Sequence, residues 1–273
     1  MRIATWNVNS LRSRIDRVEA LLDRHEIDVL ALQETKARED QLPLMGLQAR
    51  GYDVAAAGFN QWNGVALISR VGLEDIEVGF PGMPGWGDPV APEARAIGAT
   101  CGGVRVWSLY IPNGRKPDDP HYLYKLDWLA RLREAAHEWQ DRPTALVGDW
   151  NICPTDADVF DVAQFKNSTH VTPAERAAFQ AFLDDGWAEV TRDHAPGYTY
   201  WDYYRQRFER DRGLKIDFVL GSPPFADRVA GAFIDREERA GQGASDHAPV
   251  VVDLQPEQDH DQAQGSVQGS VQG

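Results

Sequence analysis

Short apolar runs alternate along the chain with stretches of helical spacing. The apolar runs are typical of buried strands, and they cover residues 2–6, 28–32, 54–57, 64–69, 144–147, 216–220 and 249–254. Residues 96–100 and 104–110 flank Gly102-Gly103 and predict a hairpin. Strands that alternate with helices favour an α/β fold.

Three helices are predicted from apolar residues that recur every three or four positions. The first spans about residues 11–25, and the third begins at Thr172-Pro173-x-Glu175 and ends near Asp184. The second spans about residues 122–140 and is followed by Pro143. The apolar face of this second helix is predicted to carry Leu123, Leu126, Leu129 and Leu132.

The end of the chain differs in composition from the rest. Beyond Leu254 the residues are mainly Gln, Asp, Gly and Ser, and the last ones repeat Gly-Ser-Val-Gln. A segment with so few apolar residues cannot bury a core. We therefore predict one domain, residues 1–254, followed by a disordered tail, residues 255–273.

Composition indicates the cellular setting. No apolar run approaches the roughly 18 residues that a membrane span requires. The N-terminus has neither the basic flank nor the apolar stretch of a signal peptide. Two cysteines, Cys101 and Cys153, are too few for a disulfide framework. We expect a cytoplasmic protein with no membrane partner.

The net charge of −14 argues, taken alone, against a nucleic-acid partner. Three of the carboxylates, Glu257, Asp259 and Asp261, lie in the tail, and the body remains acidic without them. A local basic face can coexist with an acidic total. Any phosphate-binding surface must therefore be local.

Polar residues recur where apolar strands give way to loops. These residues are Asn7, Glu34, Tyr110, Asp149, Asn151, Asp246 and His247. Such positions line the rim of a sheet, where α/β proteins commonly place their chemistry. Each residue alone has an ordinary interpretation, because an Asn after a strand is most often a turn former and a Glu there is usually just exposed. The argument rests on their occurrence together.

Carboxylate and amide oxygens suit one class of metal ion. Glu34, Asp149 and Asp246, with the amides of Asn7 and Asn151, offer oxygen ligands. The sequence contains no His/Cys cluster with zinc spacing. Oxygen ligands predict Mg²⁺, for which Mn²⁺ can substitute, and such ions assist phosphoryl chemistry. His247 would add a donor, acid or base beside a phosphate.

Five motifs occur in order along residues 1 to 254. They are Thr5-Trp6-Asn7-Val8-Asn9-Ser10-Leu11-Arg12, Leu32-Gln33-Glu34-Thr35-Lys36, Gly148-Asp149-Trp150-Asn151-Ile152, Gly213-Leu214-Lys215-Ile216-Asp217 and Ser245-Asp246-His247-Ala248-Pro249. In this the chain resembles the exonuclease III family of abasic-site endonucleases. The resemblance implies a four-layer α/β sandwich, with two packed mixed sheets flanked by helices as in deoxyribonuclease I. It also implies a DNA repair enzyme that cuts 5′ to abasic sites, with 3′-5′ exonuclease and 3′-phosphatase activity.

The resemblance also implies a role for each motif residue. The metal would be held by Glu34, with Asn7, Asp149, Asn151, Asp246 and His247 near it. Asp149 would activate the attacking water, Asn151 would hold that water, and Tyr110 would donate to the phosphate. His247 would contact the phosphate while Asp217 fixes its ring. Whether Asp149 or the Asp217–His247 pair is the base stays open.

Three basic clusters lie next to motif residues. The segment 203–215 carries Arg205, Arg207, Arg210, Arg212 and Lys215, the first predicted helix carries Arg12, Arg14 and Arg17, and Arg115 with Lys116 follows Asn113-Gly114. Each cluster is either a solvated surface or a phosphate-binding loop. The DNA contacts predicted in these regions are Arg12, Asn113, Arg115, Tyr200, Trp201, Arg210, Arg212 and Leu214. By family resemblance, Tyr200, Trp201, Leu214 and Ile216 would line an apolar pocket for a flipped abasic sugar.

Two other functional classes remain to be weighed. A phosphatase or phospholipase of the same superfamily would act on inositol phosphates or sphingomyelin. A catalytically silent binding module would be expected to lose Glu34, Asp149, Asn151 or His247, and the sequence keeps all four. The basic segment 203–215 favours double-stranded DNA with abasic sites or damaged 3′ ends as the partner of a monomeric enzyme.

Overall fold

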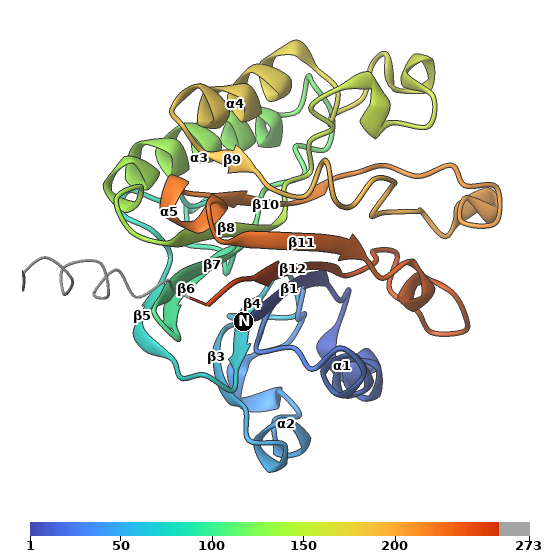
Figure 1. The fold of residues 1–273 in the computed structure, drawn as a ribbon. Coiled ribbons are helices and arrows are strands. Elements are labelled where there is room, and N and C mark those ends of the chain that lie inside the picture. Colours follow the sequence, from blue (N-terminus) through green and yellow to red (C-terminus); the bar gives the residue numbers. More distant parts are fainter. Residues whose placement is uncertain (257–273) are drawn as a thin grey trace, which may run out of the picture.

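Two six-stranded sheets pack face to face in the computed structural model, which describes residues 1–256 (Figure 1). The order across the first sheet is β11 (Val229–Ile234), β12 (Val250–Leu254), β1 (Arg2–Asn7), β2 (Val29–Gln33), β4 (Val65–Ser69) and β3 (Asp53–Ala57). The order across the second sheet is β5 (Glu74–Val78), β6 (Ala96–Cys101), β7 (Val104–Tyr110), β8 (Thr144–Asp149), β10 (Asp217–Gly221) and β9 (Ala188–Glu189).

Helices cover the outer faces of both sheets (Figure 1). The helices α1 (Leu11–His25) and α2 (Met45–Ala49) lie outside the first sheet, and α3 (Pro120–Ala136) and α4 (Pro173–Asp184) lie outside the second. A short helix, α5 (Pro223–Ala226), follows β10. The predicted four-layer α/β sandwich with two mixed sheets is confirmed.

Three hydrophobic clusters correspond to the three interfaces between layers. Ile3 of β1 and Val106 of β7 belong to the cluster between the sheets. Trp6 points to the opposite face of β1 and packs with Leu21 of α1. This opposition follows from the alternation of side chains along a strand, which lets one strand contribute to two interfaces. Trp107 and Trp187 are buried as well, so large aromatic side chains contribute to the core.

Strand register brings the polar strand ends together. β1 pairs in parallel with β2 and antiparallel with β12, so that Asn7 lies opposite Gln33 and Arg2 opposite Asp253. In the second sheet, Tyr110 lies opposite Asp149, which also pairs with Asp217. Because the parallel strands end at the same edge of each sheet, the residues that follow them share one rim.

One predicted helix face is wrong. Leu123 is 68% exposed, while Tyr124, Lys125 and Trp128 of α3 are buried. Leucines spaced every three residues drift around a helix that has 3.6 residues per turn. The buried face follows the mixed four- and three-residue spacing of His121, Lys125, Leu129 and Leu132 more closely. The aromatic residues of α3, rather than a leucine stripe, pack on the sheet.

Several elements were not predicted. β5 has an exposed side chain at every position, and β11 is only partly buried, so neither shows an apolar run. No helix among residues 1–256 combines the length and apolarity that a membrane crossing requires. The predicted disordered tail begins at residue 255, and most of it, residues 257–273, lies outside the described residues.

Candidate active site

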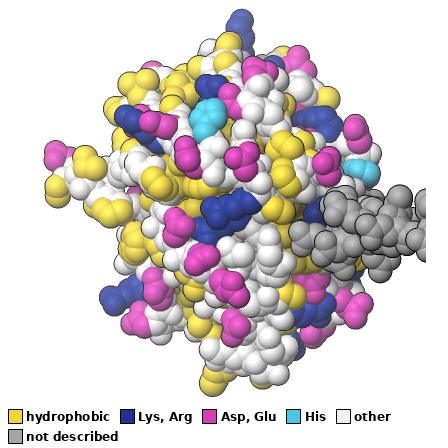
Figure 2. Space-filling model, turned by 60° about the vertical axis from the view of Figure 1, so that its left-hand side comes forward, with side chains coloured by type: hydrophobic (Ala, Val, Ile, Leu, Met, Phe, Trp, Pro, Cys, Tyr) yellow, Lys and Arg dark blue, Asp and Glu magenta, His cyan; other side chains and the backbone are white. Residues whose placement is uncertain are grey.

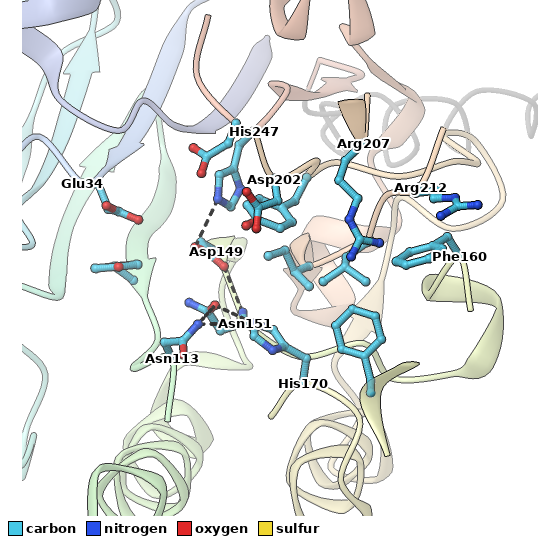
Figure 3. A pocket seen from close by; sticks show the side chains of 16 residues that line it. Glu34, Asn113, Asp149, Asn151, Phe160, His170, Asp202, Arg207, Arg212 and His247 are labelled. Carbon is cyan, nitrogen blue, oxygen red and sulfur yellow. Dashed lines mark hydrogen bonds and ion pairs between the residues drawn. The ribbon is translucent and has the colours of Figure 1, made fainter. Parts of the chain in front are cut away.

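A pocket of about 300 Å³ opens at the rim where both sheets end (Figure 3). Strand ends supply its acidic side, with Glu34 after β2, Asp149 at the end of β8, and Asp246 and His247 just before β12. Its other walls come from loops. The remaining lining residues are Tyr110, Asn113, Asn151, Phe160, Phe165, His170, Tyr200, Asp202, Arg207, Arg212, Leu214 and Ile216.

Two of these side chains depend on unusual backbone geometry. Glu34 has φ 52° and Asn151 has φ 50°, so both lie in the left-handed region that non-glycine residues seldom adopt. Such conformations persist only where surrounding contacts hold them, and they concentrate at functional sites. Here they turn the chain sharply after β2 and β8 and direct both side chains into the pocket (Figure 3).

His247 lies between two carboxylates. Its Nδ1 is 2.9 Å from Oδ2 of Asp217, and its Nε2 is 3.8 Å from Oδ2 of Asp149. Burial alone would lower the pKa of His247, but the carboxylates of Asp217 and Asp149 outweigh it and raise this pKa to about 10. The imidazole is therefore a cation at neutral pH, and it presents an N–H to the pocket.

The carboxylate of Asp149 is buried among other acidic groups. Burial raises its pKa to about 7, which the His247 imidazolium opposes and the charges of Asp217 and Glu34 reinforce. Its Oδ1 accepts from the backbone N–H of Asn151 at 3.0 Å, and its Oδ2 accepts from Nδ2 of Asn7 at 3.0 Å. A carboxyl group with a pKa near neutrality suits proton transfer.

Glu34 is the second carboxylate that Asn7 holds. Nδ2 of Asn7 donates to its Oε1 at 2.8 Å, and Nζ of Lys36 lies 2.7 Å from its Oε2. Burial would raise the pKa of Glu34, but Lys36 and Asn7 together keep it below its ordinary value, so the group stays ionised.

A metal ion fits this donor set. Ligand-type atoms of Glu34, Asp149 and His247 lie within 4.8 Å of one another, and because the imidazole of His247 is protonated, the two carboxylates are the groups that can hold an ion. The carboxylates offer oxygen ligands of the kind that hard divalent cations prefer, and Asn7 holds both of them through its Nδ2. Asp246 lines the same pocket and accepts from Nδ2 of Asn9 at 3.0 Å.

Asn151 is fixed from three directions. Its Nδ2 donates to the carbonyl of Ile111 at 3.0 Å, and its Oδ1 lies 3.1 Å from both Nδ2 of Asn113 and Nε2 of His170. Burial, followed by the charge of Lys125, lowers the pKa of His170 to about 4, so this ring is neutral. The amide of Asn151 therefore has a defined orientation beside Asp149 (Figure 3).

A buried ion pair lies beneath these amides. The ammonium of Lys125 in α3 contacts the carboxylate of Glu175 in α4 and donates to the backbone carbonyls of Asn151 at 2.6 Å and Asn113 at 3.3 Å. Glu175 in turn accepts from the backbone N–H of His170. Both side chains are fully buried, so this pair ties two outer helices to three loops of the pocket.

The structure brings together the residues predicted for catalysis and metal binding. Tyr110, Asn151 and Asp246 line the pocket with Glu34, Asp149 and His247, while Asn7 and Asp217 lie buried directly behind it. Burial raises the pKa of Tyr110 well above its ordinary value, with Glu34 adding to the effect, so its phenol is a neutral donor.

The predicted DNA contacts divide into two groups. Asn113, Tyr200, Arg212 and Leu214 line the pocket, whereas Arg12, Arg115, Trp201 and Arg210 do not. Trp201 is 1% exposed, and its indole N–H donates to Asp211. Arg115 lies over the ring of Trp86, beyond the pocket.

Some cations of the predicted basic clusters bind the protein itself. Arg14 donates to the carbonyls of Val8, Asn9, Gly243 and Ala244, and Arg17 pairs with Glu238. Lys215 is buried and donates to the carbonyl of Ala195. One face of the molecule shows basic and acidic side chains interspersed, without a broad basic area (Figure 2).

Sequence reasoning missed His170, Lys125 and Glu175 as parts of the site. Glu175 was expected only as a helix cap, and it does complete the capping box with Thr172. Lys125 carries a signal in retrospect, because it occupies the core-facing side of α3 once the helix is phased by its aromatic residues.

Known proteins share this arrangement over nearly the whole chain. The exodeoxyribonuclease III of Haemophilus influenzae is 29% identical over 267 residues, covering 92% of this chain and 98% of its own. The structure of the 3′ phosphatase NExo from Neisseria bound to a product DNA hairpin superposes with a TM-score of 0.88 at 37% identity, covering 93% of this chain and 99% of its own. An AP endonuclease from Archaeoglobus fulgidus superposes with a TM-score of 0.86 at 32% identity, covering 93% of this chain and 99% of its own.

The family model matches residues 4–247, which run from β1 to the histidine of the pocket. That span includes each carboxylate discussed above. The chain belongs to the endonuclease/exonuclease/phosphatase family.

Proposed function

We propose that this protein is a DNA repair nuclease that hydrolyses the bond between phosphorus and the 3′ oxygen of DNA. The three expected activities share this bond. Incision 5′ to an abasic site, removal of a 3′-terminal nucleotide and removal of a 3′ phosphate all leave a 3′-hydroxyl. One site can therefore catalyse all three reactions, which differ only in the group attached to the phosphate that is released.

The observation that carries the proposal is the position of His247 between two carboxylates beside the possible metal site, with Nδ1 2.9 Å from Asp217 and Nε2 3.8 Å from Asp149. We infer from this arrangement that Asp149 is the base and His247 the donor. A histidine that stays protonated to about pH 10 is a poor base but a good donor to a phosphate oxygen. Asp149 is the group able to accept a proton from water at neutral pH.

The neighbouring groups complete the proposed chemistry. Asp149 accepts a proton as water attacks the phosphorus, and the amide of Asn151 orients that water. His247 and the neutral phenol of Tyr110 donate hydrogen bonds to the phosphate oxygens, where negative charge grows in the transition state. Asp217 keeps the imidazole in place through Nδ1, at 2.9 Å.

We propose Mg²⁺ as the metal, held by Glu34 with Asp149 and Asp246, next to Asn7. When bound, this cation would neutralise phosphate charge and help the 3′ oxygen to leave. Mn²⁺, which also accepts oxygen ligands, would substitute.

The comparisons support 3′-end processing at least as strongly as abasic incision. Two solved structures at 37% and 38% identity are described as a 3′ phosphatase and a 3′-5′ exonuclease from Neisseria. The AP endonuclease is 32% identical. Double-stranded DNA with damaged 3′ ends is therefore the first substrate that we propose, and an abasic duplex is the second.

One assay tests the proposal. Three end-labelled duplexes, carrying an abasic site, a recessed 3′-hydroxyl end or a 3′ phosphate, are incubated with the protein with and without Mg²⁺. We expect Mg²⁺-dependent product ending in a 3′-hydroxyl from at least one duplex. Failure to process all three in Mg²⁺ or Mn²⁺ would refute the proposed function.

The matched control is Asp149→Asn, which keeps the size and the hydrogen-bonding shape of the side chain. Its loss of activity with an unchanged circular dichroism spectrum would exclude a contaminating nuclease as the source of the products. Inositol phosphates and sphingomyelin serve as competing substrates, because a superfamily phosphatase or phospholipase would hydrolyse them instead.

A further inference from the structure

Cations without partners gather on one side of the pocket. Most arginines among residues 1–256 bind a carboxylate or a carbonyl, as Arg192 binds Asp158 and Arg239 binds the carbonyl of Trp201. Within that described part of the chain, Nη1 of Arg207 is buried without a hydrogen-bond partner, and Arg212 is exposed. Both line the pocket that contains Asp149 and His247.

Arg207 is the more informative of the two. Its Nη1 is buried and has no hydrogen-bond acceptor among residues 1–256. Burying a charged donor without an acceptor is costly, so an orphaned donor of this kind calls for an explanation. The guanidinium lies 4.6 Å from the centre of the Phe160 ring, a cation–π contact that holds it in place.

The pocket therefore has two unlike ends (Figure 3). Glu34, Asp149 and Asp246 make one end acidic, so a phosphate can bind there only together with a cation. Arg207 and Arg212 make the opposite end cationic, and an anion can bind there unaided. Asp202, the other acidic residue that lines the pocket, is exposed.

Apolar side chains separate these ends. Tyr200, Leu214 and Ile216 contribute the wall between them, and this wall offers contact to a sugar ring rather than to a charge. A phosphate, a deoxyribose and a second phosphate in series match the order of acidic end, apolar wall and cationic end. In DNA this series is one nucleotide with the phosphates on its 5′ and 3′ oxygens.

We propose that Arg207, with Arg212, forms a second phosphate subsite that binds the 3′ phosphate of the nucleotide whose 5′ phosphate is hydrolysed. The inference deepens the proposed function and rests on it for the orientation of the substrate. Arginine is suited to this role because its planar fork can donate two parallel hydrogen bonds to phosphate oxygens. The subsite favours departing groups that carry a phosphate on O3′, from a continuing strand or from a phosphorylated end.

Calorimetric titration with mononucleotides tests the subsite without requiring hydrolysis. The protein in Ca²⁺, which takes the same kind of oxygen ligands as Mg²⁺, is titrated with thymidine 5′-monophosphate and with thymidine 3′,5′-bisphosphate, and chromatography afterwards checks that the ligands are intact. We expect the bisphosphate to bind at least about tenfold more tightly, as a charge-assisted arginine–phosphate contact would provide. In Arg207→Met, which keeps the aliphatic stem, this preference should vanish while monophosphate affinity changes less than about twofold.

Two controls keep the result interpretable. Arg131→Met removes an exposed arginine on the outside of α3, paired there with Asp127 and Glu134, and should preserve the full preference for the bisphosphate. Melting temperatures of both variants establish that they are folded. Arg207→Lys keeps the charge but loses the planar fork, and we expect it to keep only part of the preference.

A third ligand identifies the source of the phosphate. The dinucleotide pTpT carries a diester where the bisphosphate carries a terminal phosphate. If both ligands bind more tightly than the monophosphate, the subsite accepts the phosphate of a continuing strand. If only the bisphosphate binds more tightly, the subsite is specific for a phosphorylated end. Equal affinities of all three ligands for the unmodified protein, or an undiminished preference in Arg207→Met, would overturn the subsite. Either of these results leaves the nuclease proposal standing, because the duplex assay tests that proposal separately.

Discussion

The acidic and cationic ends of the pocket differ in how the protein holds their charges. At the acidic end, strand termini from both sheets carry the side chains, and Asn7, Asn151 and Asp217 hydrogen-bond to Asp149 or to His247. At the cationic end, Arg207 and Arg212 belong to the loop between β9 and β10, and no carboxylate among residues 1–256 pairs with them. Side chains that hydrogen bonds already hold in position suit catalysis, whereas unpaired charges on a loop suit the binding of a phosphate.

The comparison predicts that changes at the acidic end affect turnover far more than affinity. Asp149→Asn and Glu34→Gln should each lower kcat by about 10⁴-fold, the upper range for losing a positioned acid–base group, with little change in KM. Single-turnover kinetics on the 3′-phosphate duplex would measure this effect. A change confined to KM would mean that the acidic end only binds substrate.

Variants of the buried Lys125–Glu175 ion pair test whether the loops at the acidic end need this pair to keep their positions. Lys125→Met leaves the carboxylate of Glu175 buried without its partner, and should cost about 3–5 kcal/mol of unfolding free energy. Urea denaturation would measure the loss.

The double variant Lys125→Met/Glu175→Gln separates stability from positioning. It removes both charges while the introduced glutamine amide can still accept from the backbone N–H of His170, so most of the stability should return. Turnover should stay low, because the carbonyls of Asn151 and Asn113 still lack the ammonium. Full recovery of turnover together with stability would make the pair purely structural.

The protonation of His247 is a further way to test the acidic end. Asp217→Asn removes the charge that most raises the pKa of His247, so this pKa should fall well below about 10 and turnover should fall by roughly 10- to 100-fold. Because the folded-state pKa is raised, the stability that the histidine contributes is fully present below its unfolded pKa of about 6.5 and is lost as pH rises through about 10.

NMR titration of the imidazole would follow this pKa, and unfolding experiments between pH 6 and about pH 10 would follow the linked stability. The variant should show a flatter decline of stability over that range. An unchanged imidazole pKa in Asp217→Asn would assign the shift to Asp149 instead.

The smallest effect is expected from a loop cation outside the pocket. Arg210→Ala should weaken DNA binding several-fold and reduce the slope of log affinity against log salt by about 1, the loss of one phosphate contact. Fluorescence anisotropy at several salt concentrations would measure both. An unchanged slope would mean that Arg210 is part of the solvated surface only.

Sequence predicted the acidic end well because most of its residues lie directly at the end of an apolar strand, and Asp246 lies shortly before one. Asn7, Glu34 and Asp149 lie at strand ends, so locating the strands also located the residues. The supporting residues were harder to find. His170 lies in a loop without a distinctive pattern, and Lys125 was hidden by a leucine stripe of which Leu123 proved exposed.

Charge on the surface was the least predictable property. Arg12, Arg14 and Arg17 look alike in the sequence, yet Arg14 and Arg17 bind loops of the protein that are more than 200 residues away. Partners at such separations cannot be inferred from local spacing. β5 and β11 were missed for a related reason, since exposed or partly buried strands have no apolar run to reveal them.

The pairing of β1 with β12 has a consequence for the order of events during synthesis. β1 is made long before β12, and it finds this antiparallel neighbour only when residues 250–254 have been made. His247 precedes that last strand and receives a hydrogen bond on its carbonyl from Trp6, 241 positions earlier. Contacts of such long range form slowly and late. A nascent chain therefore lacks the assembled pocket until its final strand is available, and a ribosome-bound fragment ending near residue 240 should be unable to cut DNA.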